Sequence, residues 1–243
     1  MKKTKFVVLS SLLFSTALLS GGLLVLADEQ APSVASSEGH VTLIQNEEPT
    51  GPVNPVDPTK PIVDPGEEGG EPTGNKGPLS LDVAPKAFDF GEQKMYTAAH
   101  TYQAVNAADA TAGITHQYLQ VTDNRDADIF GWVVTVKQDR YLTDDNTSNT
   151  LTGATIGVPQ GEARNSLTAD PTSVDAKLKT AAVSIDLTEK RVFEAAASAK
   201  AGKGTSTSVW NSADVTLTIP ANVAKAGNYT NNVVWTLTAE ADK

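Results

Sequence analysis

The sequence contains no cysteine. This absence excludes disulfide bonds, thiol nucleophiles, cysteine-ligated metals and lipid attachment through an N-terminal cysteine. A domain without disulfide bonds or cysteine-bound metals must be stabilised mainly by its hydrophobic core. Residues 79–243 form a stretch long enough to bury such a core.

Basic residues are scarce: 19 lysines and arginines face 29 aspartates and glutamates, a net charge of −10. The chain therefore lacks the basic surface that binds nucleic acid or anionic lipid. Phosphate-rich polymers would be repelled as well. Any binding surface of the protein would have to rest on hydrogen bonds, stacking and apolar contacts.

Patterns of catalytic residues are missing too. The sequence contains no HExxH, GxSxG or GxxxxGK[ST] motif, and the three histidines (His40, His100 and His116) show no metal-ligand spacing. Carboxylates alone do not select a catalytic pair, because their separation in space decides that chemistry. We therefore expect no enzyme activity, no cofactor and no catalytic metal.

Two acidic stretches are close enough in sequence to hold calcium: Asp123 with Asp126 and Asp128, and Asp144 with the two residues after it. Neither stretch has the internal glycine and closing bidentate acid of a calcium loop. For Asp123, a local ion pair with Arg125 or a turn cap is the favoured role.

The N-terminus has the pattern of a secretory signal peptide. Three early lysines precede an apolar run over residues 6–26, and Val25 and Ala27 stand where a signal peptidase requires small or aliphatic side chains. We expect residues 1–27 to be removed, with no stable membrane insertion afterwards. The alternative is an uncleaved anchor, since the run is about long enough to span a bilayer.

Residues 28–78 contain no aromatic residue, nine of the thirteen prolines, and ten acids against two lysines. Such a segment cannot bury enough apolar surface of its own to offset the entropy lost on ordering. Prolines recur every third residue from Pro49 to Pro61, which places them on one face of a polyproline II rod. We predict a disordered, acidic, proline-rich spacer.

From Leu79 onward the sequence consists of short stretches rich in Val, Ile, Thr and aromatics, alternating apolar with polar and separated by Gly, Asn, Asp and Pro. Many short strands without intervening amphipathic helices are typical of an antiparallel sandwich or barrel. We predict an all-β domain over residues 79–243, an antiparallel β-sandwich that is immunoglobulin-like or related.

Two of the expected strands share a feature. In "GWVVTVKQ" (131–138), Trp132 and Val134 point to one face; in "NNVVWTLTAE" (231–240), Trp235 and Leu237 do the same. Such faces either fill the core, which is the commoner fate of tryptophan, or form an exposed shelf on which glycan rings stack. For Trp210, beside another expected strand, edge packing is favoured over stacking.

These two stretches, about a hundred residues apart, resemble the paired motifs of the WxL domain, a surface-binding domain of Gram-positive bacteria. "LQVTDNRDADIFGW" resembles the family's V-x-D-x-R approach to the first tryptophan and contains Asp123, Arg125 and Gly131. "AGNYTNNVVWTL" resembles a later segment and contains Tyr229. The first motif has Val134 in place of leucine, which keeps an aliphatic side chain on the tryptophan face.

The resemblance implies a cell-surface protein that attaches non-covalently to the wall, with peptidoglycan the usual ligand, and that assembles with WxL-interacting partner proteins. It implies binding motifs at Trp132, Val134, Trp235 and Leu237, supported by Asp123, Arg125, Gly131 and Tyr229. The absence of an LPxTG sorting signal agrees with attachment through the folded domain. The alternative is a protein-binding component of a surface complex, or an adhesin for host matrix proteins, with wall binding secondary.

Overall fold

The computed structural model describes residues 33–62, 69–106 and 113–240. Contacts divide the chain into two units, residues 1–42 and residues 43–243. In the first unit, residues 33–42 are exposed and belong to no helix or strand. The predicted signal peptide lies outside the described residues, and no helix within them is long and apolar enough to cross a membrane.

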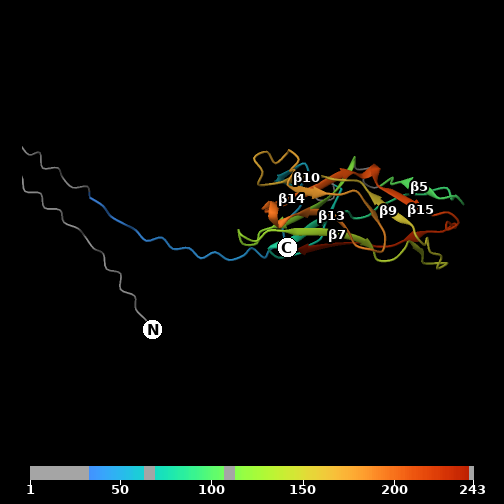
Figure 1. Ribbon diagram of the computed structural model, residues 1–243, viewed down its shortest axis with the longest axis horizontal. Helices are drawn as coiled ribbons and strands as arrows, with labels where there is room; N and C mark the ends of the chain where they lie inside the picture. Colours follow the sequence, from blue (N-terminus) through green and yellow to red (C-terminus); the bar gives the residue numbers. More distant parts are fainter. Residues whose placement is uncertain (1–32, 63–68, 107–112, 241–243) are drawn as a thin grey trace, which may run out of the picture. The chain divides into compact units, whose positions relative to one another are not determined.

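The second unit is built from antiparallel strands (Figure 1). A five-stranded sheet has the order β10-β14-β6-β4-β3, and two four-stranded sheets have the orders β11-β13-β7-β17 and β12-β9-β15-β5. Two pairs, β1-β2 and β16-β8, complete the unit. The predicted all-β, antiparallel fold class is thus confirmed, and the helical segments of the described residues are short 3-10 turns.

The elements in chain order are β1 (Val53–Asn54), β2 (Asp57–Pro61), β3 (Glu71–Pro72), β4 (Leu79–Ala84), β5 (His100–Gln103), β6 (His116–Asp123), β7 (Trp132–Gln138), β8 (Thr143–Asp144), β9 (Thr155–Val158), β10 (Glu162–Asn165), β11 (Leu178–Thr180), β12 (Val183–Ile185), β13 (Lys190–Ala195), η2 (Ala197–Ala199), β14 (Gly204–Asn211), η3 (Ser212–Asp214), β15 (Thr216–Ile219), β16 (Tyr229–Thr230) and β17 (Val233–Ala239).

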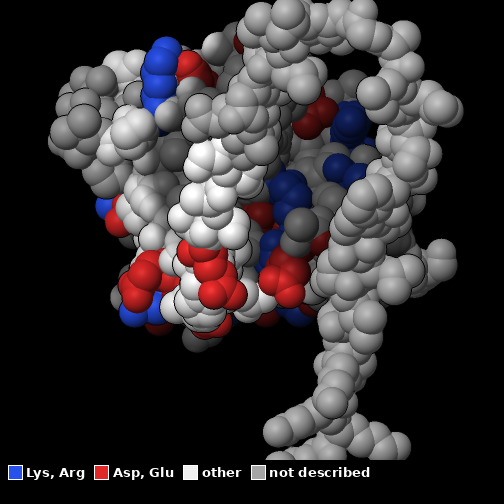
Figure 2. All heavy atoms as spheres, turned by 90° about the vertical axis from the view of Figure 1, so that its left-hand side faces the viewer, with Lys and Arg blue, Asp and Glu red and all other residues white. Residues whose placement is uncertain are grey.

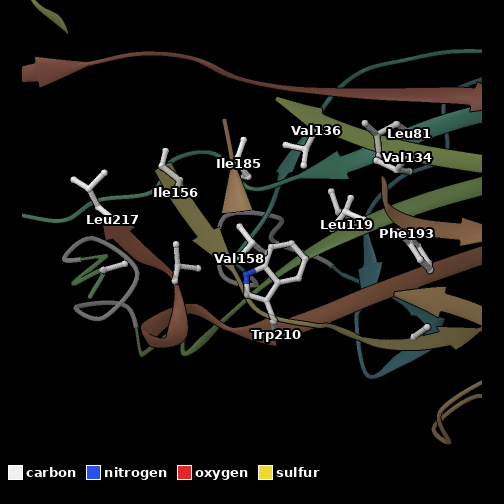
Figure 3. Close-up of a cluster of buried hydrophobic side chains, with 14 of the residues drawn as sticks. Leu81, Leu119, Val134, Val136, Ile156, Val158, Ile185, Phe193, Trp210 and Leu217 are labelled. Atoms are coloured by element: carbon white, nitrogen blue, oxygen red, sulfur yellow. The ribbon is translucent and has the colours of Figure 1, made fainter. Parts of the chain in front are cut away.

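One large core draws side chains from all three of the larger sheets. Alternation along the strands explains it, because successive side chains point to opposite faces of a sheet. In β6, for example, Leu119 and Val121 belong to this core. Leu119 lies on the same side of the core as Val134 and Phe193 of the β7 sheet (Figure 3). The core therefore lies between the inner face of the five-stranded sheet and the two four-stranded sheets.

The outer face of the five-stranded sheet is also covered, by part of the segment that was expected to be disordered. The β1-β2 hairpin is fixed to this face by hydrogen bonds. The Gln120 side chain accepts from Val53 N (2.8 Å) and donates to Gly51 O (3.0 Å), and the Thr207 hydroxyl donates to Pro55 O (2.8 Å). Beneath the hairpin, Tyr118 is completely buried.

The interpretation of residues 28–78 as one disordered spacer is therefore corrected for the hairpin and for β3, which pairs with β4. The polyproline rod is interrupted by a turn, in which the Asn54 side chain accepts from the backbone N–H groups of Val56 and Asp57. The segment lacks a core of its own, but it needs none, because it covers apolar and polar groups of an existing sheet. Its prolines are tolerated in strands that have a free edge.

Candidate functional site

The two tryptophan motifs lie side by side. β7 and β17 are antiparallel neighbours, with Trp132 opposite Ala239, Val134 opposite Leu237, and Val136 opposite Trp235. Both tryptophans point toward the core face of the sheet, but they occupy different ends of the strand pair. Their environments differ accordingly.

Trp132 is a core residue with no exposed surface. Its indole N–H donates to Gly202 O at 3.1 Å, and its ring packs edge-on against Phe193 with centroids 4.9 Å apart. Val134, next along the same face, is also completely buried. Neither side chain can touch a ligand in this arrangement, so both contribute to the surface only by fixing the strands.

Three of the predicted supporting residues meet at the Trp132 end of these strands. The buried Asp123 carboxylate accepts two hydrogen bonds from the Arg125 guanidinium, at 2.9 and 2.8 Å, and Lys203 Nζ lies 3.2 Å from the same carboxylate. Arg125 also donates to Gly131 O, which accepts from Glu240 N at the end of β17 as well. These residues form the favoured ion pair, and it ties the end of β6 to the start of β7 and the end of β17.

Gly131 can only be glycine here. Its φ is +88°, and a Cβ at this position would come within 2.3 Å of the Glu240 carbonyl oxygen. A side chain would therefore push the C-terminal end of β17 away from β7.

The surface of the protein carries charges of both signs. In Figure 2, acidic and basic side chains lie beside one another on the visible face.

Trp235 and Leu237 are only partly buried, because β17 is the edge strand of its sheet. The Trp235 ring lies between two other aromatic rings, with centroid distances of 6.5 Å to Phe88 and 6.5 Å to Trp210. No sequence pattern links Phe88 with either tryptophan motif, because the three aromatic residues come from distant segments and meet only in the fold.

Trp235 forms part of the wall of a groove with a volume of about 780 Å³, a size typical of ligand sites. The groove runs between residues 85–95, which follow β4, and residues 224–235, which lead into β17. The aliphatic lining of the groove includes Leu142, Leu151, Ile156, Leu217 and Ile219. The aromatic lining includes Phe88, Phe90, Tyr102, Tyr229 and Trp235. The polar lining includes Lys86, Asp89, Lys225, Asn228, Asn231 and Asn232.

Tyr229, the remaining predicted residue, lines this groove rather than joining Asp123, Arg125 and Gly131. Burial, together with the nearby Asp144 carboxylate, raises the pKa of the Tyr229 phenol. It donates to Lys225 O at 3.0 Å and thereby holds the 225–229 loop.

Asn231 and Asn232 fix the start of β17. Asn231 donates to Gln138 Oε1 (2.8 Å), and the backbone and side chain of Asn232 donate to Asp139. Burial of Asp139 acts against its charged form, but these hydrogen bonds outweigh burial and hold its pKa below the usual value. The groove thus presents aromatic faces, an apolar floor and neutral amides, which are groups suited to binding a ligand.

Comparisons with known proteins agree with this arrangement. The family model described as "WxL domain surface cell wall-binding" matches residues 30–240, most of the chain, including both tryptophan strands and the β1-β2 hairpin. A search of the curated proteins found no match. The family is one of surface-binding domains and supports attachment to the cell wall at the cell surface. The chain therefore belongs to the WxL family of surface cell wall-binding domains.

Proposed function

We propose that the protein is secreted and attaches non-covalently to peptidoglycan, and that the groove beside Trp235 is its binding site. The observation that carries the proposal is the half-buried Trp235 ring in the groove wall, close to Phe88 and next to a set of neutral amides. Aromatic faces and amides can hold a sugar ring by apolar contact and hydrogen bonds without any basic surface. A chain with net charge −10 requires such a mode of binding.

The test is sedimentation of the purified protein with protein-free sacculi. Trp235→Leu removes the aromatic wall while keeping an apolar side chain on a partly buried position, and we expect binding to fall at least tenfold. Trp132→Phe is the matched control. It changes a tryptophan of the same motif that is buried away from the groove, so it should lower stability and leave the binding of the folded protein unchanged.

Equal binding by the Trp235→Leu variant and the parent would move the site away from this groove. No sedimentation of the parent protein itself would overturn direct recognition of peptidoglycan.

A second candidate function, assembly with a partner surface protein or a host matrix protein, is favoured by the free edge of β17. Asn232 O and Glu240 N bond to the β7 side, so the backbone groups of Val233, Trp235, Leu237 and Ala239 face outward. Residues 231–239 contain no charge and no proline, the usual protections of an edge strand. An extended segment of a partner could pair with this edge.

Leu237→Pro tests this second function, because it removes one outward N–H from the edge while proline is tolerated at edge positions. If strand pairing holds a partner, the partner should no longer co-purify with this variant from cells, whereas sedimentation with sacculi should persist. Co-purification unchanged by Leu237→Pro would exclude pairing at this edge.

A further inference from the structure

Behind the groove wall, two buried polar atoms have no hydrogen-bond partner among the described residues: the indole Nε1 of Trp210 and the side-chain Oε1 of Gln117. Trp210 is 5% exposed and Gln117 1%. Buried polar groups in native proteins are nearly always paired, so a buried donor and a buried acceptor left together require an explanation. One is that a ligand pairs with them.

The two atoms come from directly opposite positions on neighbouring strands. Trp210 of β14 pairs with Gln117 of β6 in the antiparallel register, so their side chains stand next to each other on one face of the sheet. The Gln117 amide is oriented by its Nε2, which donates to Ala87 O at 2.9 Å. Its oxygen is left as the unpaired acceptor.

Each of the two side chains contacts a residue that lines the groove. The Trp210 ring stacks on Trp235, with an interplanar angle of 28°, and both Trp235 and Ala87 line the groove. Figure 3 shows the Trp210 nitrogen on the side of the ring next to Val158 and away from Leu119 and Phe193. The unpaired donor and acceptor therefore lie one side chain behind the groove wall.

We propose that this pair recognises a secondary amide, namely the acetamido group of an amino sugar in the glycan strand. Its carbonyl oxygen accepts the hydrogen bond from Trp210, its N–H donates to Gln117, and its methyl group packs against the apolar floor. An acetamido group ends in a methyl and can enter a closed space, whereas a peptide bond within a chain continues on both sides. The inference rests on the proposed function, because it names the group that the same groove reads.

Neither atom is open to solvent, so the acetamido group reaches them only when the Trp235 ring turns aside. β17 is an edge strand, which leaves that ring half-buried rather than enclosed. Binding should therefore change the surroundings of Trp235 as well as Trp210, and leave Trp132 unaffected.

The experiment uses the indole N–H signals of the three tryptophans in proton–nitrogen correlation spectra of the labelled protein. The probes are the tetrasaccharide of N-acetylglucosamine, cellotetraose, which has hydroxyls in place of the acetamido groups, and a short alanine peptide with a free amino terminus, which has peptide bonds but no acetamido group. We expect the tetrasaccharide to shift the Trp210 signal strongly and the Trp235 signal measurably, and cellotetraose to shift Trp210 little. Trp210→Phe, which removes the N–H, should weaken binding to sacculi about tenfold relative to Trp132→Phe.

An unmoved Trp210 signal with the tetrasaccharide, in protein that still sediments with sacculi, overturns the inference and leaves the proposed function standing. A shift of Trp210 with the alanine peptide but not with the tetrasaccharide overturns the assignment to the acetamido group. Failure of the parent protein to sediment with sacculi overturns the proposed function itself, and the inference with it. Because the spectra use the parent protein, the inference stays testable even if Trp210→Phe does not fold.

Discussion

The ion-pair cluster at Asp123 should contribute more to stability than any surface ion pair of this protein. The Asp123 side chain is completely buried, whereas those of Arg125 and Lys203 retain 11% and 18% exposure. Replacing Asp123 with alanine leaves two positive charges close together at a poorly hydrated site. Removing one partner of a buried pair costs about 3–5 kcal/mol, and residual hydration of the two cations places the expected loss near the lower end, about 3 kcal/mol.

The control is the pair between Lys190 and Asp186, which are 3.1 Å apart and 36% and 35% exposed. Water solvates both groups there, so Lys190→Ala should cost less than about 1 kcal/mol. Urea unfolding followed by tryptophan fluorescence gives both values on the same scale. The two variants differ in burial of the pair rather than in the kind of interaction removed.

A loss below about 1 kcal/mol for Asp123→Ala would refute the reasoning, since the cluster would then behave like a surface pair. Added salt provides a second check. Because buried charges are screened weakly, 0.5 M sodium chloride should change the free energy of unfolding of the parent little, and far less than the substitution does.

Four further predictions follow from other sites. Gly131→Ala should lower the free energy of unfolding by about 2 kcal/mol or more, because the backbone has a positive φ here and the added Cβ would overlap the Glu240 carbonyl oxygen. A free energy of unfolding in urea equal to that of the parent would contradict this. Gln120→Leu should release the β1-β2 hairpin, because the variant loses the hydrogen bonds of Gln120 to Val53, Gly51 and Asp82. The release would be seen as faster protease cleavage within residues 51–62. Unchanged cleavage would show that these hydrogen bonds do not hold the hairpin in place. The hydrogen bond from the Thr188 hydroxyl, with other contacts, lowers the pKa of Asp186 from 3.8 to about 2, so the stabilisation of the fold by the Asp186 carboxylate is present above pH 4 and lost as pH falls toward 2. Asp186→Asn should therefore flatten the decline of the melting temperature between pH 4 and pH 2. Equal declines for the parent and the variant would contradict this. Sedimentation with sacculi should be stronger at pH 5 than at pH 7, because the net negative charge of the protein decreases toward the isoelectric point of 4.7. Binding should also persist in moderate salt. Binding abolished by salt would mean that attraction between opposite charges holds the protein on the sacculi.

Part of the site could be anticipated from local pattern: of the predicted residues, Trp235 and Tyr229 line the groove. The alternation in β7 and β17 placed each tryptophan on the same face as its aliphatic neighbour, and the strands do present these side chains together. The ion pair of Asp123 with Arg125 was also expected, because two residues of separation allow a guanidinium to reach a carboxylate across a turn.

The hairpin of residues 53–61 was not anticipated, for a physical reason. The expectation of disorder weighed the apolar surface that the segment carries within itself. In the folded protein the relevant surface belongs to others: Gln120 and Thr207 supply hydrogen bonds, and Tyr118 and Val209 supply apolar area under Ile62. A sequence does not show which sheet face will be left uncovered.

The sequence by itself determined that this protein is an antiparallel β structure with two tryptophan-bearing strands, since period-two alternation is a local property of the chain. It also determined, by the absence of cysteine, that the protein holds no disulfide. Only the tertiary structure decided that Trp132 is core while Trp235 borders a groove, because each is the tryptophan of a similar motif and points to the same face of the sheet. The difference arises because β7 has a strand on each side, whereas β17 is an edge strand, and burial depends on neighbours that come from elsewhere in the chain.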